Sequence, residues 1–120
     1  MAKNVIQKKS YEFAVEVIKA YQMLKKTHHE YDLFRQFLRS GTSIGANIQE
    51  SVAAQSRKDF LSKVYISFKE ARETLYWINL LIDTGYLTPP FSNTLKSKCE
   101  ELIRILSSIT KTTSETLKKI

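Results

Sequence analysis

Apolar side chains recur along most of the chain at alternating intervals of three and four residues. This spacing places them on one face of an α-helix, because a helix turns once in 3.6 residues. The first stripe comprises Ile6, Ser10, Phe13, Val17, Ala20 and Leu24. Asn4, three residues before Gln7, predicts a cap at its start. Thr27, three residues before Glu30, forms a capping-box pattern that predicts a second helix, so the first should end near Lys26.

The segment RSGTSIGANIQES, residues 39–51, holds two of the three glycines and invites comparison with a phosphate-binding loop. A P-loop needs two glycines five residues apart, followed by Lys and a hydroxyl residue, whereas Gly41 and Gly45 are four apart and Ala46 follows. The apolar stripe instead runs through the segment in phase as Phe34, Phe37, Gly41, Ile44 and Ile48. We therefore predict a continuous helix whose small residues admit a close neighbour, which offsets a propensity cost of about 1 kcal/mol per glycine.

The second half of the chain carries two further stripes. Ser56 with Asp59 is a capping box that opens a long helix over residues 57–84, and Gly85 with Leu87 predicts its C-terminal cap. Its expected core line is Leu61, Val64, Phe68, Ala71, Leu75, Ile78 and Ile82. Residues 88–90, TPP, start a fourth helix with the stripe Leu95, Cys99, Leu102, Leu106, Ile109 and Thr113, and residues 107–120 are expected to fray. The fold class is all-α: residues 1–120 form a single domain, an up-down-up-down four-helix bundle.

The helix over residues 57–84 has a second line on roughly the opposite face. The line comprises Ile66, Glu70, Glu73, Trp77 and Leu80. A helix that is apolar on two sides is buried on two sides, so we expect a homo-oligomer with Ile66, Trp77 and Leu80 at the subunit interface. Alternatively, Trp77 covers the end of the bundle or packs on the loop near Tyr86. The sequence does not decide which stripe faces inward.

A polar strip accompanies the apolar stripe of the second helix. Ser40, Ser43, Asn47 and Glu50 are spaced 3,4,3 and lie about 100° from that stripe. We expect a buried polar network in which Ser43, Asn47 and Glu50 bond across to the long helix, where the candidate partners are Glu70, Arg72 and Glu73. A ligand-binding or partner-binding role for the strip is the alternative.

The net charge of +7 and the pI of about 9.5 favour a polyanionic partner. Residues 1–30 and residues 85–120 each hold six cations and three acids, whereas residues 31–84 carry a net charge of +1. We therefore expect the first and fourth helices to share a basic face that contacts phosphates of RNA or DNA. Its candidates are Lys3, Lys8, Lys9, Lys19, Lys25, Lys26, Lys96, Lys98, Arg104, Lys111, Lys118 and Lys119. A solvated face that keeps the protein soluble is the alternative.

Residues capable of catalysis do not assemble into a recognisable set. Cys99 is the only cysteine and lies on a core stripe, so it forms no intrachain disulfide and is expected to be inert. A di-metal bundle needs Glu-x-x-His on two helices, but His28 and His29 are expected in solvent at a helix start. We expect no enzyme activity, metal or cofactor. No apolar run approaches the roughly 20 residues that span a bilayer, and the expected location is cytoplasmic.

With these motifs placed, the segments LRSGTSIGANIQES (38–51), AQSRKDFLSKVYIS (54–67) and KEARETLYWINLLIDTGYL (69–87) resemble the four-helix-bundle family of 23S rRNA intervening-sequence proteins. The resemblance implies a homopentamer and no known catalysis. It also implies a fold shared with the pentameric, basic accessory protein of diversity-generating retroelements, which works with a reverse transcriptase and nucleic acid. Many members have Ala-Glu-Gly where this chain has Gln49-Glu50-Ser51, which predicts a different end of the second helix. The expected function is RNA or DNA binding by a non-catalytic oligomer; the alternative is an oligomeric scaffold for a protein partner.

Overall fold

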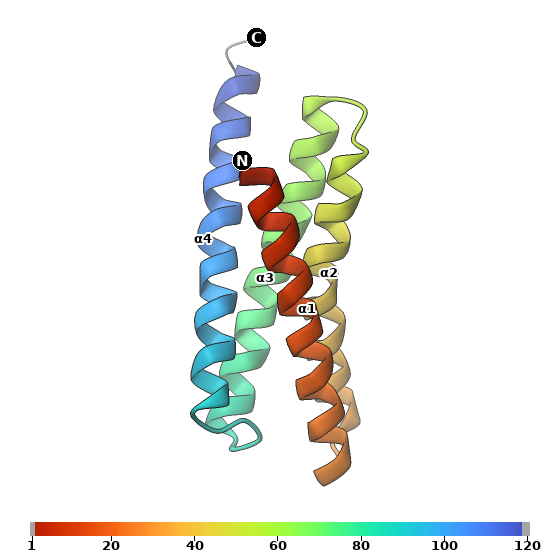
Figure 1. The fold of residues 1–120 in the computed structure, drawn as a ribbon, viewed down its shortest axis with the longest axis vertical. Helices are drawn as coiled ribbons and strands as arrows, with labels where there is room; N and C mark the ends of the chain where they lie inside the picture. The colour runs from red at the N-terminus through yellow and green to blue at the C-terminus, as the bar shows by residue number, and fades with distance from the viewer. Residues whose placement is uncertain (1, 119–120) are drawn as a thin grey trace.

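The computed structural model describes residues 2–118, and it describes side-chain surroundings from residue 5 onward. The four helices are α1 (Ala2–Thr27), α2 (Tyr31–Val52), α3 (Arg57–Asp83) and α4 (Phe91–Lys118). Each runs antiparallel to the next, and α4 returns beside α1, so that both ends of the chain lie at the same end of the bundle (Figure 1). The predicted all-α, up-down-up-down arrangement is confirmed for the described residues.

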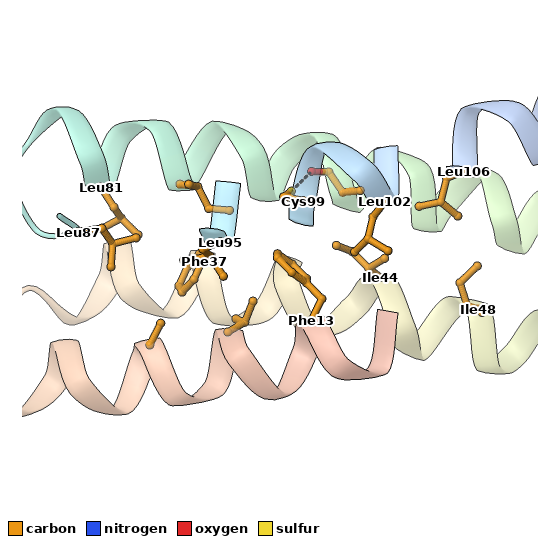
Figure 2. Packing of buried hydrophobic residues seen from close by; sticks show 14 of the residues in the cluster. Phe13, Phe37, Ile44, Ile48, Leu81, Leu87, Leu95, Cys99, Leu102 and Leu106 are labelled. Carbon is orange, nitrogen blue, oxygen red and sulfur yellow. Dashed lines mark hydrogen bonds between the residues drawn. The ribbon is translucent and has the colours of Figure 1, made fainter. Parts of the chain in front are cut away.

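The core of the bundle follows the predicted stripes of α1, α2 and most of α4. Every stripe residue of α1 and α2 is buried, and α4 contributes a buried line from Leu95 to Leu106. Phe13, Phe37 and Ile44 meet side chains of α4 along the axis of the bundle (Figure 2). Ile109 and Thr113, toward the end of α4, are only half-buried.

Gly41 and Gly45 lie inside a continuous α2, as predicted, and the structure identifies α1 as the close neighbour. A Cβ at Gly41 would lie 2.8 Å from both γ-carbons of Val17. A Cβ at Gly45 would lie 3.3 Å from the backbone oxygen of Ser10. The two glycines therefore bring α1 and α2 closer than alanine would allow, which is the packing reason for glycine inside a helix.

The predicted core line of α3 is right only in part: its members Val64, Ala71 and Ile78 are buried, but the buried line is displaced from the predicted one. The residues that face the core are Val64, Ser67, Ala71, Thr74, Ile78 and Leu81. The other four predicted members are only half-buried: Phe68, Leu75 and Ile82 pack at the edge of the core, and Leu61 lines a hollow between α3 and α4. The helix is rotated because two small hydroxyl residues occupy core positions and bond to α2: Ser67 Oγ donates to Ile44 O (2.8 Å), and Thr74 Oγ1 to Ser40 Oγ (3.0 Å).

The ends of α3 are capped as predicted. Ser56 Oγ accepts from the N–H of Asp59 (3.0 Å), and the Asp59 carboxylate reaches back to the N–H of Gln55 (3.2 Å). Gly85 has a φ of +84°, the left-handed region that favours glycine. Leu87 folds back, buried, and its N–H donates to Leu81 O (3.0 Å).

Three predicted helix boundaries are wrong. Thr27 is the last residue of α1 and not the N-cap of α2; Glu30 caps α2 by accepting from the N–H of Leu33 (3.3 Å). Asn4 lies within α1, which begins at Ala2. The last segment remains helical to Lys118, where fraying was expected. At Gln49-Glu50-Ser51, where the chain departs from the Ala-Glu-Gly of many family members, α2 continues to Val52, and Ser51 Oγ donates to Ile48 O (2.6 Å).

Candidate nucleic-acid interface and neighbouring surfaces

The groove between α1 and α4 was the expected centre of the basic face, but ion pairs close it. Lys9 Nζ lies 3.2 Å from Glu101 Oε2, and Lys98 Nζ lies 2.7 Å from Glu16 Oε2. The hollow that remains is about 70 Å³ and is also lined by Glu12. This flank of the bundle is therefore close to neutral.

The remaining predicted cations do not share one surface with that groove. Lys8 and Lys19 are exposed on α1 outside its core face. Lys25 and Lys26 line a hollow between α1 and α2, where Lys25 Nζ lies 5.2 Å from the ring centroid of Tyr21. Lys96, Arg104, Lys111 and Lys118 lie on α4 about 120° or more around the helix from Lys98. The side chains of Lys3 and Lys119 lie outside the described residues.

The groove between α3 and α4 has a different character. It is an open hollow of about 560 Å³ with Leu61 and Tyr65 from α3, four Ser or Thr hydroxyls, and a lysine on each helix, Lys58 and Lys111. Lys69 Nζ lies 6.0 Å from the ring centroid of Tyr65. Lys58, Lys69 and Lys111 have no carboxylate oxygen within 4.0 Å among the described residues. We call this surface the α3/α4 groove.

Lys58, Tyr65 and Lys69 were absent from the predicted basic face, because the charge of residues 31–84 was taken as a sum. The acids of that segment do not face the α3/α4 groove. Glu70 and Glu73 instead pair with Arg39 of α2. The signal that could have found the basic flank is the angular position of each charge around α3, rather than the sum for the segment.

A polar cluster around these two glutamates joins α2 to α3. Arg39 Nη1 donates to Glu70 Oε2 (3.0 Å), and Arg39 also donates to Glu73. Trp77 Nε1 donates to Glu73 Oε2 (3.0 Å). Burial opposes ionisation of Glu73, but the hydrogen bonds from Trp77 and Arg39 outweigh it, so the pKa of Glu73 is lowered. The hydrogen bond to Glu73 raises the pKa of Arg39 further above its usual range.

The membership of this cluster differs from the predicted network. Ser43 and Asn47 bond within α2: Ser43 Oγ donates to Arg39 O (2.6 Å), and Asn47 Nδ2 donates to Ser43 O (2.8 Å). Glu50 is exposed and pairs with Lys63 (3.2 Å). Arg72 is exposed on the α4 side of α3, with its guanidinium 6.0 Å from the ring centroid of Phe68, so its inclusion in a buried network is wrong.

Three residues that make the α2–α3 connection were absent from the prediction: Arg39, Ser67 and Thr74. The usable signal for Ser67 and Thr74 was their spacing, because they continue the 3,4 interval from Val64 to Leu81. For Arg39 the sequence offers no signal stronger than its place one turn before Ser43.

The predicted interface residues lie on the outer side of α3. Ile66 is 40% exposed, whereas Trp77 and Leu80 are half-buried. The Trp77 ring packs edge-on against Tyr76, with centroids 5.1 Å apart. Tyr86, near which the alternative placed Trp77, packs against Phe34 (5.2 Å) and His28 (4.8 Å).

The sequence and the fold of this chain are both similar to those of known proteins. The model of the 23S rRNA-intervening sequence protein family matches residues 2–108. The chain belongs to this family. A crystal structure of a protein of unknown function from the S23 ribosomal protein family, from Bacteroides thetaiotaomicron, is 44% identical with a TM-score of 0.86, and the match covers 92% of this chain and 99% of that one. Comparison with curated proteins finds no match.

Cys99 and His28 of this intervening-sequence family member lie among packed side chains. Burial, followed by the nearby charge of Glu100, raises the pKa of Cys99 to about 12, and its thiol donates to Ala71 O (3.4 Å; Figure 2). His28, expected in solvent, is half-buried among aromatic rings. Within residues 5–118 no three His, Cys, Asp or Glu side chains gather as a metal site. No helix in the described part of the chain is both long and apolar enough to cross a bilayer.

Proposed function

We propose that the protein is a non-catalytic homo-oligomer that binds the phosphate backbone of RNA or DNA through cations on its surface. The proposal rests mainly on the lysines of the α3/α4 groove. None of them has a carboxylate oxygen within 4.0 Å in the described structure. Unpaired lysines are free to replace the counterions of a polyanion. The net charge of +7 adds long-range attraction for such a ligand.

The absence of catalysis in the proposal is supported by the states of the reactive groups. A nucleophilic cysteine needs a thiolate, and a thiol with a pKa of about 12 is protonated at neutral pH. The two clustered glutamates, Glu70 and Glu73, are bound by Arg39 and by Trp77, which leaves neither of them as a free general base.

Self-association in the proposal rests on the outer side of α3. Ile66, Tyr76, Trp77 and Leu80 give this side an apolar surface next to the Arg39–Glu70–Glu73 cluster. Tryptophan and arginine are enriched among residues that dominate interface energies. We propose that this surface joins copies of the chain, and that five copies assemble, as the family resemblance implies.

Salt-dependent binding of nucleic acid tests the proposed function. A fluorescein-labelled structured RNA should bind at low ionic strength, and log K should fall linearly with log salt as counterions are released. The competing interpretation is an oligomeric scaffold for a protein partner. An absence of RNA and DNA binding at low salt would reject the nucleic-acid role and favour the scaffold.

Substitution at the outer side of α3 tests the assembly. Trp77→Asp and Ile66→Asp should each reduce the mass measured by light scattering toward that of a 13.9 kDa chain, because a buried carboxylate without a partner is costly. Ile66→Asp is the safer variant, since Ile66 touches less of the core. Tyr11→Asp, at a 71% exposed position on α1, is the matched control and should leave the mass unchanged. If Ile66→Asp keeps the assembled mass, this side of α3 is not the interface.

A further inference from the structure

The α3/α4 groove combines three features that a duplex-binding surface does not need together. It is a hollow rather than a flat face, it contains lysines on both walls, and it contains an exposed aromatic ring. Tyr65 is 52% exposed, so much of its ring is open to solvent. The inner side of the ring is held by Phe68, whose centroid lies 6.2 Å away at an interplanar angle of 46°.

The cations of the groove surround this ring. Lys58 and Lys111 line the same hollow as Tyr65, and Lys69 lies over its ring at 6.0 Å. The carboxylates on the same side of α4 are Glu100 and Glu115, and neither comes within 4.0 Å of a lysine of the groove. The lysines around Tyr65 are therefore not neutralised by an ion pair in the described structure, which suits the phosphates next to a stacked base.

The remaining wall is made of hydroxyl groups. Ser62 lies on α3, and Ser107, Thr110 and Ser114 follow one line on α4. Hydroxyl groups bond to phosphate and sugar oxygens without reading base identity. A lysine-lined channel with hydroxyl groups and an open aromatic ring is the arrangement with which proteins hold single strands.

We propose that the α3/α4 groove binds a single strand of RNA or DNA, with one unpaired base stacked on Tyr65 and the flanking phosphates between Lys58 and Lys111. This inference rests on the proposed function and adds the strandedness of the ligand and the residue that selects it. A duplex would engage the lysines but could not present a base face to Tyr65, because its bases are stacked on one another. Tyr76 and Leu80 of the proposed subunit interface lie on the same side of α3 as Tyr65, but three or more turns further along the helix, whereas Trp77 lies toward α2.

The test compares single strands with duplexes on the assembled wild-type protein and on tyrosine variants. Fluorescence anisotropy with labelled oligo-dT and oligo-rU 12-mers should give tighter binding than a 12-base-pair duplex at the same salt, and the two oligomers distinguish DNA from RNA. Tyr65→Ala should weaken single-strand binding about five- to hundredfold, the range expected from one stacked base. Tyr65→Phe should retain most of the affinity, because the ring rather than the hydroxyl carries the contact.

Tyr11→Ala is the matched control, because it removes an exposed tyrosine from another helix without changing charge. It should leave single-strand binding unchanged. Equal loss in Tyr65→Ala and Tyr11→Ala, or no loss in Tyr65→Ala, would overturn the inference. Tighter binding of the duplex would also overturn it while the proposed function stands. Absence of binding to every nucleic acid would instead reject the proposed function. If Tyr65→Ala lowered the assembled mass, the groove would be a subunit contact and the inference would fall.

Discussion

The two flanks of α4 carry the same kinds of residues in opposite arrangements. On the flank facing α1, Lys98 is held by Glu16, and Glu101 holds Lys9, around a hollow of about 70 Å³. On the flank facing α3, Lys111 borders a hollow of about 560 Å³ and has no ion pair in the described structure. A lysine is available to a polyanion only where the neighbouring helix supplies no carboxylate, so the position of a charge matters more than its sum.

The largest expected difference between the flanks is in nucleic-acid affinity. Lys58→Ala/Lys111→Ala should weaken binding of a single-stranded oligonucleotide about tenfold or more, and should reduce the slope of log K against log salt by roughly 1.4. Lys9→Ala/Lys98→Ala removes the same net charge from the other flank and should change affinity less than about twofold. Anisotropy titrations at several salt concentrations measure both quantities. Equal losses in the two variants would mean that binding follows net charge and not the groove.

In stability the order should be reversed, with the larger loss in the variant that lacks Lys9 and Lys98. Lys9→Ala/Lys98→Ala removes two partly exposed ion pairs and should lower the free energy of unfolding by about 1 kcal/mol. Lys58→Ala/Lys111→Ala removes no ion pair and should change it by less than about 0.5 kcal/mol. Urea denaturation followed by circular dichroism compares them. A larger loss in the second variant would show that the lysines of the α3/α4 groove have structural partners.

The smallest expected effect comes from releasing a paired lysine. Glu101→Gln frees Lys9 and should raise affinity for the same oligonucleotide about twofold, because one more cation becomes available. Glu12→Gln is the control, since Glu12 lines the same hollow but has no lysine within 4.0 Å in the described structure. The comparison is read from parallel titrations at one salt concentration. A gain as large in Glu12→Gln would attribute the effect to net charge.

The rotation of α3 shows where reading an apolar stripe fails. In α1 and α2 large apolar residues occupy most core positions, so the stripe and the core coincide. In α3 the core positions include Ser67 and Thr74, while Phe68 and Leu75 stand at its edge. Hydroxyl groups can be buried without large cost when they are hydrogen-bonded, and both have partners on α2. The acceptor atoms belong to α2, so the spacing of residues within α3 alone cannot predict these hydrogen bonds.

Candidate surface residues were harder to assign than the core for a related reason. The sequence placed Lys9 and Lys98 among the free cations, yet each is paired with a glutamate of the facing helix. Lys9 and Glu101 are 92 positions apart in the chain. Whether they come into contact depends on how far α1 is shifted along α4. The spacing of residues within either helix does not indicate that shift.

The sequence by itself determined that this chain forms four amphipathic helices, which residues of α1, α2 and most of α4 share a buried face, and that cations exceed acids. These are local properties, set by the 3.6-residue turn and by composition. Only the tertiary structure decided which side of α3 is buried and which lysines remain unpaired. Those outcomes depend on the rotation and axial shift of each helix against its neighbours. The close approach of α1 at Gly41 and Gly45 and the hydrogen bonds between α2 and α3 together set this rotation and shift.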